Sequence, residues 1–98
     1  DVLQIFIDNS AETINMEMDI DSSGMIEPLE LGEQIWVEGR LTEWICYDMG
    51  LSGNIPSGIG TLINLTYLNI GKNELSGEVP ESLGNLTNLL SLHLGLNY

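Results

Sequence analysis

Apolar positions in the second half of the chain recur at a fixed spacing of 24 residues. A shift of the sequence by 24 positions superimposes Leu41, Leu65 and Leu89, then Trp44, Leu68 and Leu92, then Cys46, Ile70 and Leu94. The turn sequence Leu51-Ser52-Gly53 falls on Leu75-Ser76-Gly77 in the same way. A fixed period of about 20–50 residues is typical of architectures in which each repeat stacks on the next. The spacing therefore predicts stacked repeats, with Leu68 and Ile70 facing inward and Tyr67 and Asn69 facing outward.

The motif within each period resembles a known family. The pattern L-x-x-L-x-L-x-x-N is complete at residues 65–73 and 89–97, and L-S-G-x-[IV]-P follows at 51–56 and 75–80. This resembles leucine-rich repeats of the 24-residue type found in plant receptor ectodomains and in some secreted bacterial proteins. The resemblance implies an α/β fold, a short solenoid of parallel strands with an irregular or 3-10 convex side. The repeats would span residues 41–64, 65–88 and, in part, 89–98. It also implies that Asn73 and Asn97 bond to backbone between neighbouring turns, whereas Met49 holds that place in the first repeat.

Residues 1–40 precede the repeats and are expected to form an N-terminal cap over the first repeat core. Residues 1–8 fit a short strand and a buried helix turn equally well. For residues 10–18, Asn9 and Glu12 fit a helix cap, whereas the alternation from Ile14 to Ile20 fits a strand, and the two alternatives stay open. Residues 29–37 are predicted to form a short helix that Gly39 ends.

The stretch DIDSSGMIEPLE, residues 19–30, matches the calcium-loop pattern D-x-[DN]-x-[DN]-G-x5-E at every position but one. It resembles an EF-hand loop. The ligands implied are Asp19, Asp21, Ser23, the backbone carbonyl of Met25, Glu27 and Glu30. Gly24 permits the sharp turn, Ile26 is the apolar anchor to the core, and Pro28 suits the first position of an exit helix. We expect calcium as the cofactor that stabilises the cap, bound weakly because Ser23 replaces an acidic residue; the alternative is a solvated acidic turn.

The net charge of the chain limits the kinds of partner that we expect. Fifteen acidic residues against Arg40 and Lys72 give a formal net charge of −13, and twelve of the fifteen lie in residues 1–48. Nucleic acids and anionic membrane surfaces require clustered Lys and Arg, so neither is an expected partner. No apolar run approaches the roughly 18 residues of a membrane span, so no membrane insertion is expected. Cations are the natural small partner, although an acidic surface also serves solubility.

The sequence offers no catalytic constellation. Cys46 occupies the position of Ile70 and Leu94 in the repeat and is expected to be a buried, unreactive thiol. His93 is the only histidine, and the acidic residues near position 20 are explained by the calcium pattern. We therefore expect a protein that is not an enzyme.

The outward positions of the predicted strands form the candidate partner-binding face. They are Glu43, Ile45, Tyr47, Tyr67, Asn69, Lys72 and His93. Ile45, Tyr47 and Tyr67 would make an aromatic–aliphatic patch, unless three strands are too few to form a groove. The sequons at Asn64 and Asn85 predict surface positions, glycosylated in a secretory context, although N-L-T also belongs to the repeat pattern itself.

These observations predict an extracellular or cell-surface interaction module with a calcium-stabilised cap. Its partner would be a protein or glycan, or copies of itself in a structural assembly. The chain lacks an initiator Met and stops ten residues into the third repeat, so we expect a processed or trimmed product. The last strand would be an open edge. Either a downstream segment covers it or the VLQIFI segment of another copy adds to it as a strand, head to tail.

Overall fold

The computed structural model describes residues 2–97. One α-helix and six strands follow one another along the chain: α1 (Val2–Asn9), β1 (Glu33–Val37), β2 (Arg40–Ile45), β3 (Ser52–Asn54), β4 (Tyr67–Asn69), β5 (Glu74–Ser76) and β6 (Ser91–His93). Short 3-10 turns lie between them: η1 (Met16–Met18), η2 (Pro28–Glu30), η3 (Ser57–Thr61) and η4 (Glu81–Asn85).

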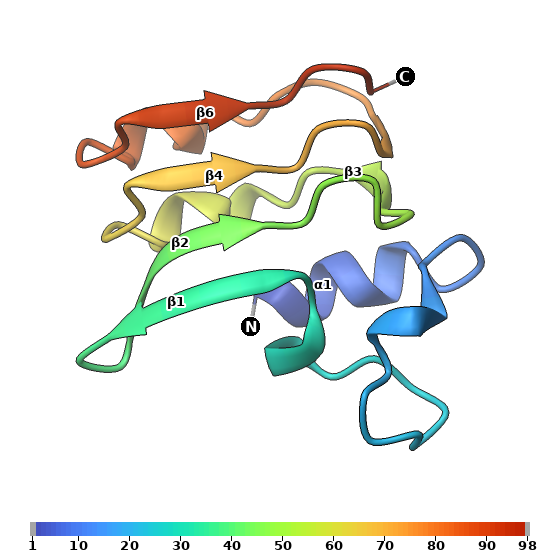
Figure 1. Cartoon of the computed structure of the whole chain (residues 1–98). Coiled ribbons are helices and arrows are strands. Elements are labelled where there is room, and N and C mark those ends of the chain that lie inside the picture. Colours follow the sequence, from blue (N-terminus) through green and yellow to red (C-terminus); the bar gives the residue numbers. More distant parts are fainter. Residues whose placement is uncertain (1, 98) are drawn as a thin grey trace.

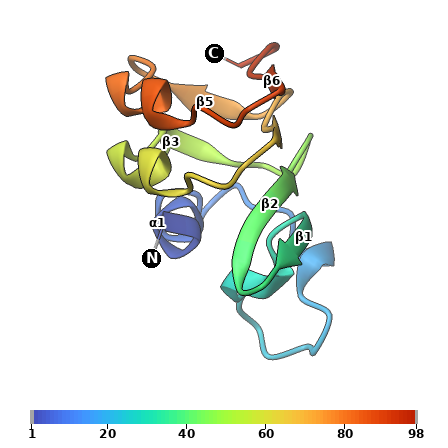
Figure 2. The same ribbon diagram turned by 90° about the vertical axis from the view of Figure 1, so that its left-hand side faces the viewer.

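The strands form two sheets that enclose one core. The larger sheet has the order β1-β2-β4-β6 (Figure 1), and the smaller sheet pairs β3 with β5 (Figure 2). In the larger sheet β2, β4 and β6 run parallel, whereas β1 runs antiparallel to β2. Figure 2 shows α1 below the 3-10 turns that follow β3 and β5, across the core from β2 and β6. Apolar residues of α1, of the segment between α1 and β1, and of the strands and turns that follow form a single buried cluster.

The prediction of a repeat solenoid is wrong. The structure is a small, compact α/β domain with a mixed four-stranded sheet, a second two-stranded sheet and one α-helix. The antiparallel strand β1 comes from the segment predicted as a cap, yet it belongs to the same sheet as the parallel strands. The 24-residue spacing indicates how the parallel strands align, but it carries no information on the antiparallel strand and the helix that complete the domain.

The register predicted for the parallel strands is confirmed. Trp44 pairs with Leu68, and Leu68 with Leu92, each 24 residues apart. Leu68 and Ile70 are fully buried, whereas Tyr67 and Asn69 on the other face are partly exposed. The backbone repeats at the same interval, because Asp48, Lys72 and Leu96 all adopt a positive φ, each three residues after its strand ends.

Asn73 connects two neighbouring turns through its buried side-chain amide. Its Oδ1 accepts hydrogen bonds from the backbone N–H groups of Met49 and Leu51, each at 3.0 Å. Its Nδ2 donates to the carbonyl oxygens of Cys46 at 2.8 Å and Ile70 at 2.9 Å. Buried backbone groups in irregular segments need such partners, so the predicted role of this asparagine is confirmed. Asn97 repeats the arrangement with Leu75, Ile70 and Leu94.

The N-terminal segment is helical rather than extended. Within α1, Val2, Leu3, Phe6 and Ile7 are buried. The apolar residues fall on one helical face at the spacing i, i+1, i+4, i+5, and burial against the core decides between the two structures that the sequence left open. This segment is therefore not available as a strand added to another copy. The alternation in residues 10–18 does not produce a strand either, because the chain forms turns and the single 3-10 turn η1.

The predicted helix over residues 29–37 is wrong. Residues Pro28–Glu30 form one 3-10 turn and Glu33–Val37 form β1. Gly32, with φ +70°, ends the turn in a conformation that glycine adopts easily. Glu38 and Gly39 have φ values of 51° and 77°, and positive φ at both central residues is what a two-residue type I′ hairpin requires. Gly39 thus closes a hairpin between β1 and β2 rather than a helix.

Two leucines that differ in burial test the core assignment. Leu68 is fully buried and Leu90 is 88% exposed. Leu68→Ala is expected to lower the free energy of unfolding by about 2–5 kcal/mol, through lost apolar transfer and the cavity left behind. Leu90→Ala is expected to change it by less than about 0.5 kcal/mol. Urea unfolding of both variants checks this, and equal losses would contradict the assigned faces.

Asn73 permits a second test. In Asn73→Ala, the N–H groups of Met49 and Leu51 lose their acceptor, and an unpaired buried polar group costs about 1–3 kcal/mol. We expect a loss of several kcal/mol, or failure to fold. Asn88→Ala is the control, because Asn88 is exposed and donates only one side-chain bond, to the Ile63 carbonyl at 3.0 Å. Thermal unfolding should separate the two variants clearly; a mild effect at Asn73 would contradict its structural role.

Candidate functional site

The acidic loop of residues 19–30 begins directly after η1 and ends with η2. Asp19 follows η1 as its C-terminal cap, and Pro28 is the first residue of η2. Pro28 therefore has the predicted position, but a single 3-10 turn stands where an EF-hand has its exit helix. Gly24 adopts φ +88°, the left-handed conformation that the sharp turn requires.

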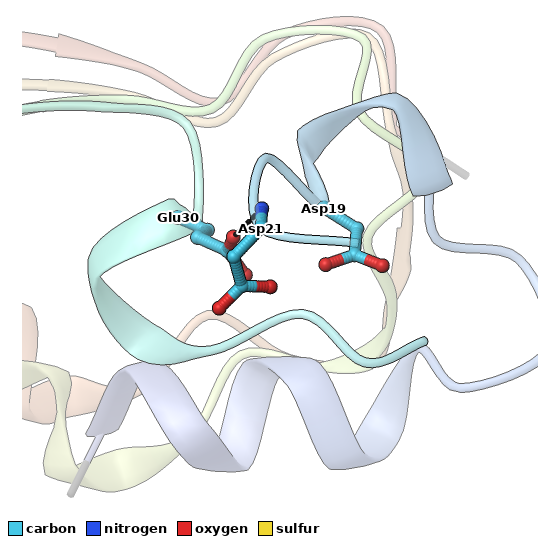
Figure 3. A group of neighbouring side chains, drawn as sticks. All are labelled: Asp19, Asp21 and Glu30. Atoms are coloured by element: carbon cyan, nitrogen blue, oxygen red, sulfur yellow. Dashed lines mark hydrogen bonds between the residues drawn. The ribbon is translucent and has the colours of Figure 1, made fainter. Parts of the chain in front are cut away.

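The loop brings three carboxylates together. Asp19, Asp21 and Glu30 each offer one oxygen, and these oxygens all lie within 4.8 Å of one another. Figure 3 shows the carboxylates of Asp21 and Glu30 side by side, with Asp19 next to them in the same loop. Oxygen ligands are what calcium and magnesium take in proteins. These three residues, at the first, third and twelfth positions of the pattern, therefore fit a hard divalent cation.

Backbone N–H groups hold the carboxylates in place. One oxygen of Glu30 accepts from the N–H groups of Ile20 at 2.9 Å and Asp21 at 3.2 Å. The other accepts from Glu27 at 3.0 Å, which completes a capping box at η2. Asp19 accepts from the N–H of Gly24 at 2.8 Å. The loop thus closes on itself around its first and last acidic residues.

The remaining predicted ligands gather around the Ser23 hydroxyl. Ser23 Oγ lies 3.0 Å from the carbonyl oxygen of Met25 and 3.0 Å from Glu27 Oε1. Its backbone N–H donates to Asp19 at 3.2 Å and Asp21 at 3.1 Å. Glu27 is not one of the three clustered carboxylates. All six predicted ligand residues are therefore in one loop, but they form two adjoining groups joined through Ser23.

The electrostatics of the loop reflect crowded negative charge. Hydrogen bonds from the side chain and then the backbone of Ser23 lower the pKa of Asp21. At Glu27 the bond from Ser23 also acts to lower the pKa. Desolvation and the nearby charges of Asp21 and Glu30 outweigh that bond and raise the pKa of Glu27 above its ordinary value. A bound cation would relieve this repulsion.

Two buried residues anchor the loop to the core: Ile26 within the loop and Leu31 directly after it. The Ile26 side chain is only 3% exposed and Leu31 is fully buried. The Leu31 carbonyl oxygen accepts from Trp44 Nε1 at 2.8 Å. Ile26 therefore has the predicted anchoring role, and the position of the loop is tied to strand β2.

The outward face of the larger sheet carries the candidate partner-binding residues in two rows. Glu43, Tyr67 and Ser91 form one row, and Ile45, Asn69 and His93 form the next. The rings of Tyr67 and His93 lie 5.6 Å apart between centroids, and Ser91 Oγ lies 3.0 Å from His93 Nε2. Beyond the rows, Tyr47 is 43% exposed, and Lys72 pairs with Asp48 at 3.7 Å.

Strand β1 adds two residues to this face that the sequence prediction missed. Ile35 pairs with Glu43, and Glu33 pairs with Ile45, so each extends one of the rows. The sequence predicts a helix over residues 29–37, which would place both residues elsewhere. The signal that could have found them is the alternation of the β-branched Ile35 and Val37 directly before the Glu38-Gly39 turn.

The structure also gives the burial of Cys46 and of the two sequon asparagines. Cys46 is fully buried, and burial raises the pKa of its thiol to about 12, so the reactive thiolate is suppressed. Asn85, the last residue of η4, is exposed, and Asn64, three residues after η3, is partly exposed. Within residues 2–97, none of the helices has the length and apolar character needed to cross a membrane.

Comparison with protein-family models, with curated proteins and with solved structures finds no significant match for this chain. The resemblance to leucine-rich repeats and to an EF-hand loop therefore rests on the sequence motifs alone.

Proposed function

We propose that this chain is a non-enzymatic, extracellular interaction module whose acidic loop binds calcium and whose outward sheet face binds a partner. The observation that carries the proposal is the convergence of Asp19, Asp21 and Glu30, with oxygens within 4.8 Å of one another, in a loop with calcium-type spacing. Like charges repel, so the assembly of three carboxylates by specific backbone hydrogen bonds supports a cation as their partner.

The same residues indicate which cation fits. The clustered carboxylates would hold the ion, with the Ser23 hydroxyl, the Met25 carbonyl and the Glu27 carboxylate as further oxygen ligands from the same loop. Calcium accepts about six to eight oxygens in flexible geometry, whereas magnesium demands a smaller octahedral site and keeps its water. A loop that offers hard oxygen ligands from six residues, without nitrogen or sulfur, therefore favours calcium.

Calcium in this loop would stabilise the whole domain rather than the loop alone. Ile26 and Leu31 are buried in the core, and the Leu31 carbonyl accepts from Trp44 on β2. Fixing the loop therefore fixes the point where the chain enters β1. A ligand that binds only the folded state raises its stability by mass action.

Calcium is expected to raise the melting temperature. For a single weak site with a dissociation constant of about 10⁻⁴–10⁻³ M, about 1 mM calcium should stabilise the fold by roughly 1 kcal/mol. In a domain of this size that corresponds to about 4–8 °C. Thermal unfolding with calcium and with chelator measures the increment. Magnesium at the same concentration should give a smaller one.

Glu30→Gln and Glu12→Gln provide the matched pair for that measurement. Both remove one negative charge, but Glu12 is exposed outside the loop. The increment produced by calcium should disappear in Glu30→Gln and persist in Glu12→Gln. Because Glu30 also accepts three backbone bonds, its variant should melt lower even without calcium, so the increment is the informative quantity. An equal increment in both variants would rule out the loop as the site.

The proposed role is binding rather than catalysis. Among residues 2–97, the one thiol is buried with a raised pKa, and His93 contacts Ser91 and Tyr67 without a carboxylate partner among its hydrogen bonds. What the domain offers instead is a partly exposed sheet face with two tyrosines. A panel of extracellular proteins and glycans tests this role. Ligands that bind the wild type but not Tyr67→Ala would support it, and no ligand dependent on this face would contradict it.

A further inference from the structure

The outward sheet face combines apolar side chains with acidic ones. Ile35 is 50% and Tyr47 43% exposed, and Ile45 and Tyr67 are partly exposed beside them. Strand register places Ile35 and Tyr67 in the row of Glu43, and Ile45 in the row of Glu33. Aromatic and aliphatic side chains at the centre of a surface are the groups that contribute most to binding between proteins.

The acidic residues on this face are not neutralised by the chain itself. Within the described part of the chain, residues 2–97, the single ion pair joins Lys72 to Asp48. The carboxylates of Glu33 and Glu43 therefore form no ion pair among these residues, and Arg40 and Lys72 are the only Lys or Arg residues in the sequence. A surface with uncompensated negative charge attracts cations and steers them toward it.

We propose that this face binds a polypeptide segment in which Lys or Arg residues stand next to aromatic or aliphatic ones. This inference rests on the proposed interaction function and names the class of its partner. The apolar residues of the segment would cover Ile35, Ile45 and Tyr67. Its basic residues would pair with Glu33 and Glu43. An arginine is particularly suited, because it can pair with a carboxylate and lie over a tyrosine ring at the same time.

The charge of the face argues against a glycan as the partner. An anionic glycan would meet both Glu33 and Glu43 and the net charge of −13, so binding would be opposed by repulsion. A neutral glycan can stack on Tyr67, but it supplies no cation for the carboxylates. A basic and apolar peptide is the ligand that uses both kinds of side chain on the face.

Three probes separate these possibilities on the whole chain in calcium. The first is a labelled 12-residue peptide that alternates Arg with Leu and Tyr. The second has Glu in place of every Arg, and the third is an uncharged oligosaccharide, cellohexaose. Fluorescence anisotropy measures the peptides and calorimetry the sugar. Binding is expected for the Arg peptide alone, and it should weaken as salt rises because the charges on the face are exposed.

Two double variants with the same change in charge locate the site. Glu33→Gln with Glu43→Gln removes the carboxylates of the face. Glu78→Gln with Glu81→Gln removes two exposed carboxylates near β5 and η4. The first pair is expected to raise the dissociation constant of the Arg peptide about tenfold or more, and the second less than about threefold. Tyr67→Ala should weaken the peptide as well, since it removes an aromatic contact.

Each outcome decides the proposal. Equal losses from the two double variants would mean attraction to the acidic protein as a whole, and would overturn it. Binding of the Glu peptide or the sugar, lost in Tyr67→Ala, would also overturn it while leaving the interaction function in place. If none of the three probes binds, the basic–apolar partner is wrong, and the panel of proteins and glycans still judges the interaction function separately.

Discussion

Trp44 is the side chain on which the three parts of the domain depend. It lies on β2 and is fully buried, with its ring 5.0 Å from that of Phe6 in α1, at an interplanar angle of 67°. Its Nε1 donates to the Leu31 carbonyl at the end of the acidic loop. The helix, the loop and the central strand therefore meet at one residue. A buried indole needs both a packed ring and a partner for its N–H, and here different segments supply the two.

This arrangement links the acidic loop to the sheet face through a short path. Leu31 is followed by Gly32 and then by β1, whose Glu33 and Ile35 extend the two outward rows. The loop fixes where β1 begins, and the hairpin fixes its register against β2. An ion that orders residues 19–30 would therefore also order the edge of the face. Coupling of this kind is reciprocal. The factor by which calcium would tighten binding of a partner to the face equals the factor by which the partner would tighten binding of calcium.

The sequence predicted those features that depend on periodicity and local chemistry. The spacing of leucines fixed which residues of β4 face inward, and the asparagine at position 73 was expected to bond between turns. Both follow from rules that act over a few residues or one repeat. The loop pattern likewise predicted the sharp turn at Gly24 and the burial of Ile26. A sharp turn favours glycine, and an anchor to the core has to be apolar.

The architecture and part of the sheet face depend on tertiary contacts, which the local sequence patterns do not reveal. Residues 29–37 contain apolar positions that suit a helix about as well as a strand, and only pairing with β2 decides between them. Residues 2–8 are similarly ambiguous until the core buries one side of them. Since tertiary contacts made these choices, the antiparallel edge of the sheet was missed, and Glu33 and Ile35 with it.

The distribution of charge gives both proposed sites a common physical basis. Twelve of the fifteen acidic residues lie in residues 1–48, the half that contains the loop, β1 and β2. Such a concentration opposes folding through self-repulsion, and the small ordinary core of this domain has little stability to spare. The repulsion weakens whenever a cation binds. A divalent ion in the loop and basic side chains on the face would each relieve part of it. The two kinds of cation would then stabilise the same acidic half of the fold, in addition to the connection that the chain makes from the loop through Leu31 to β1.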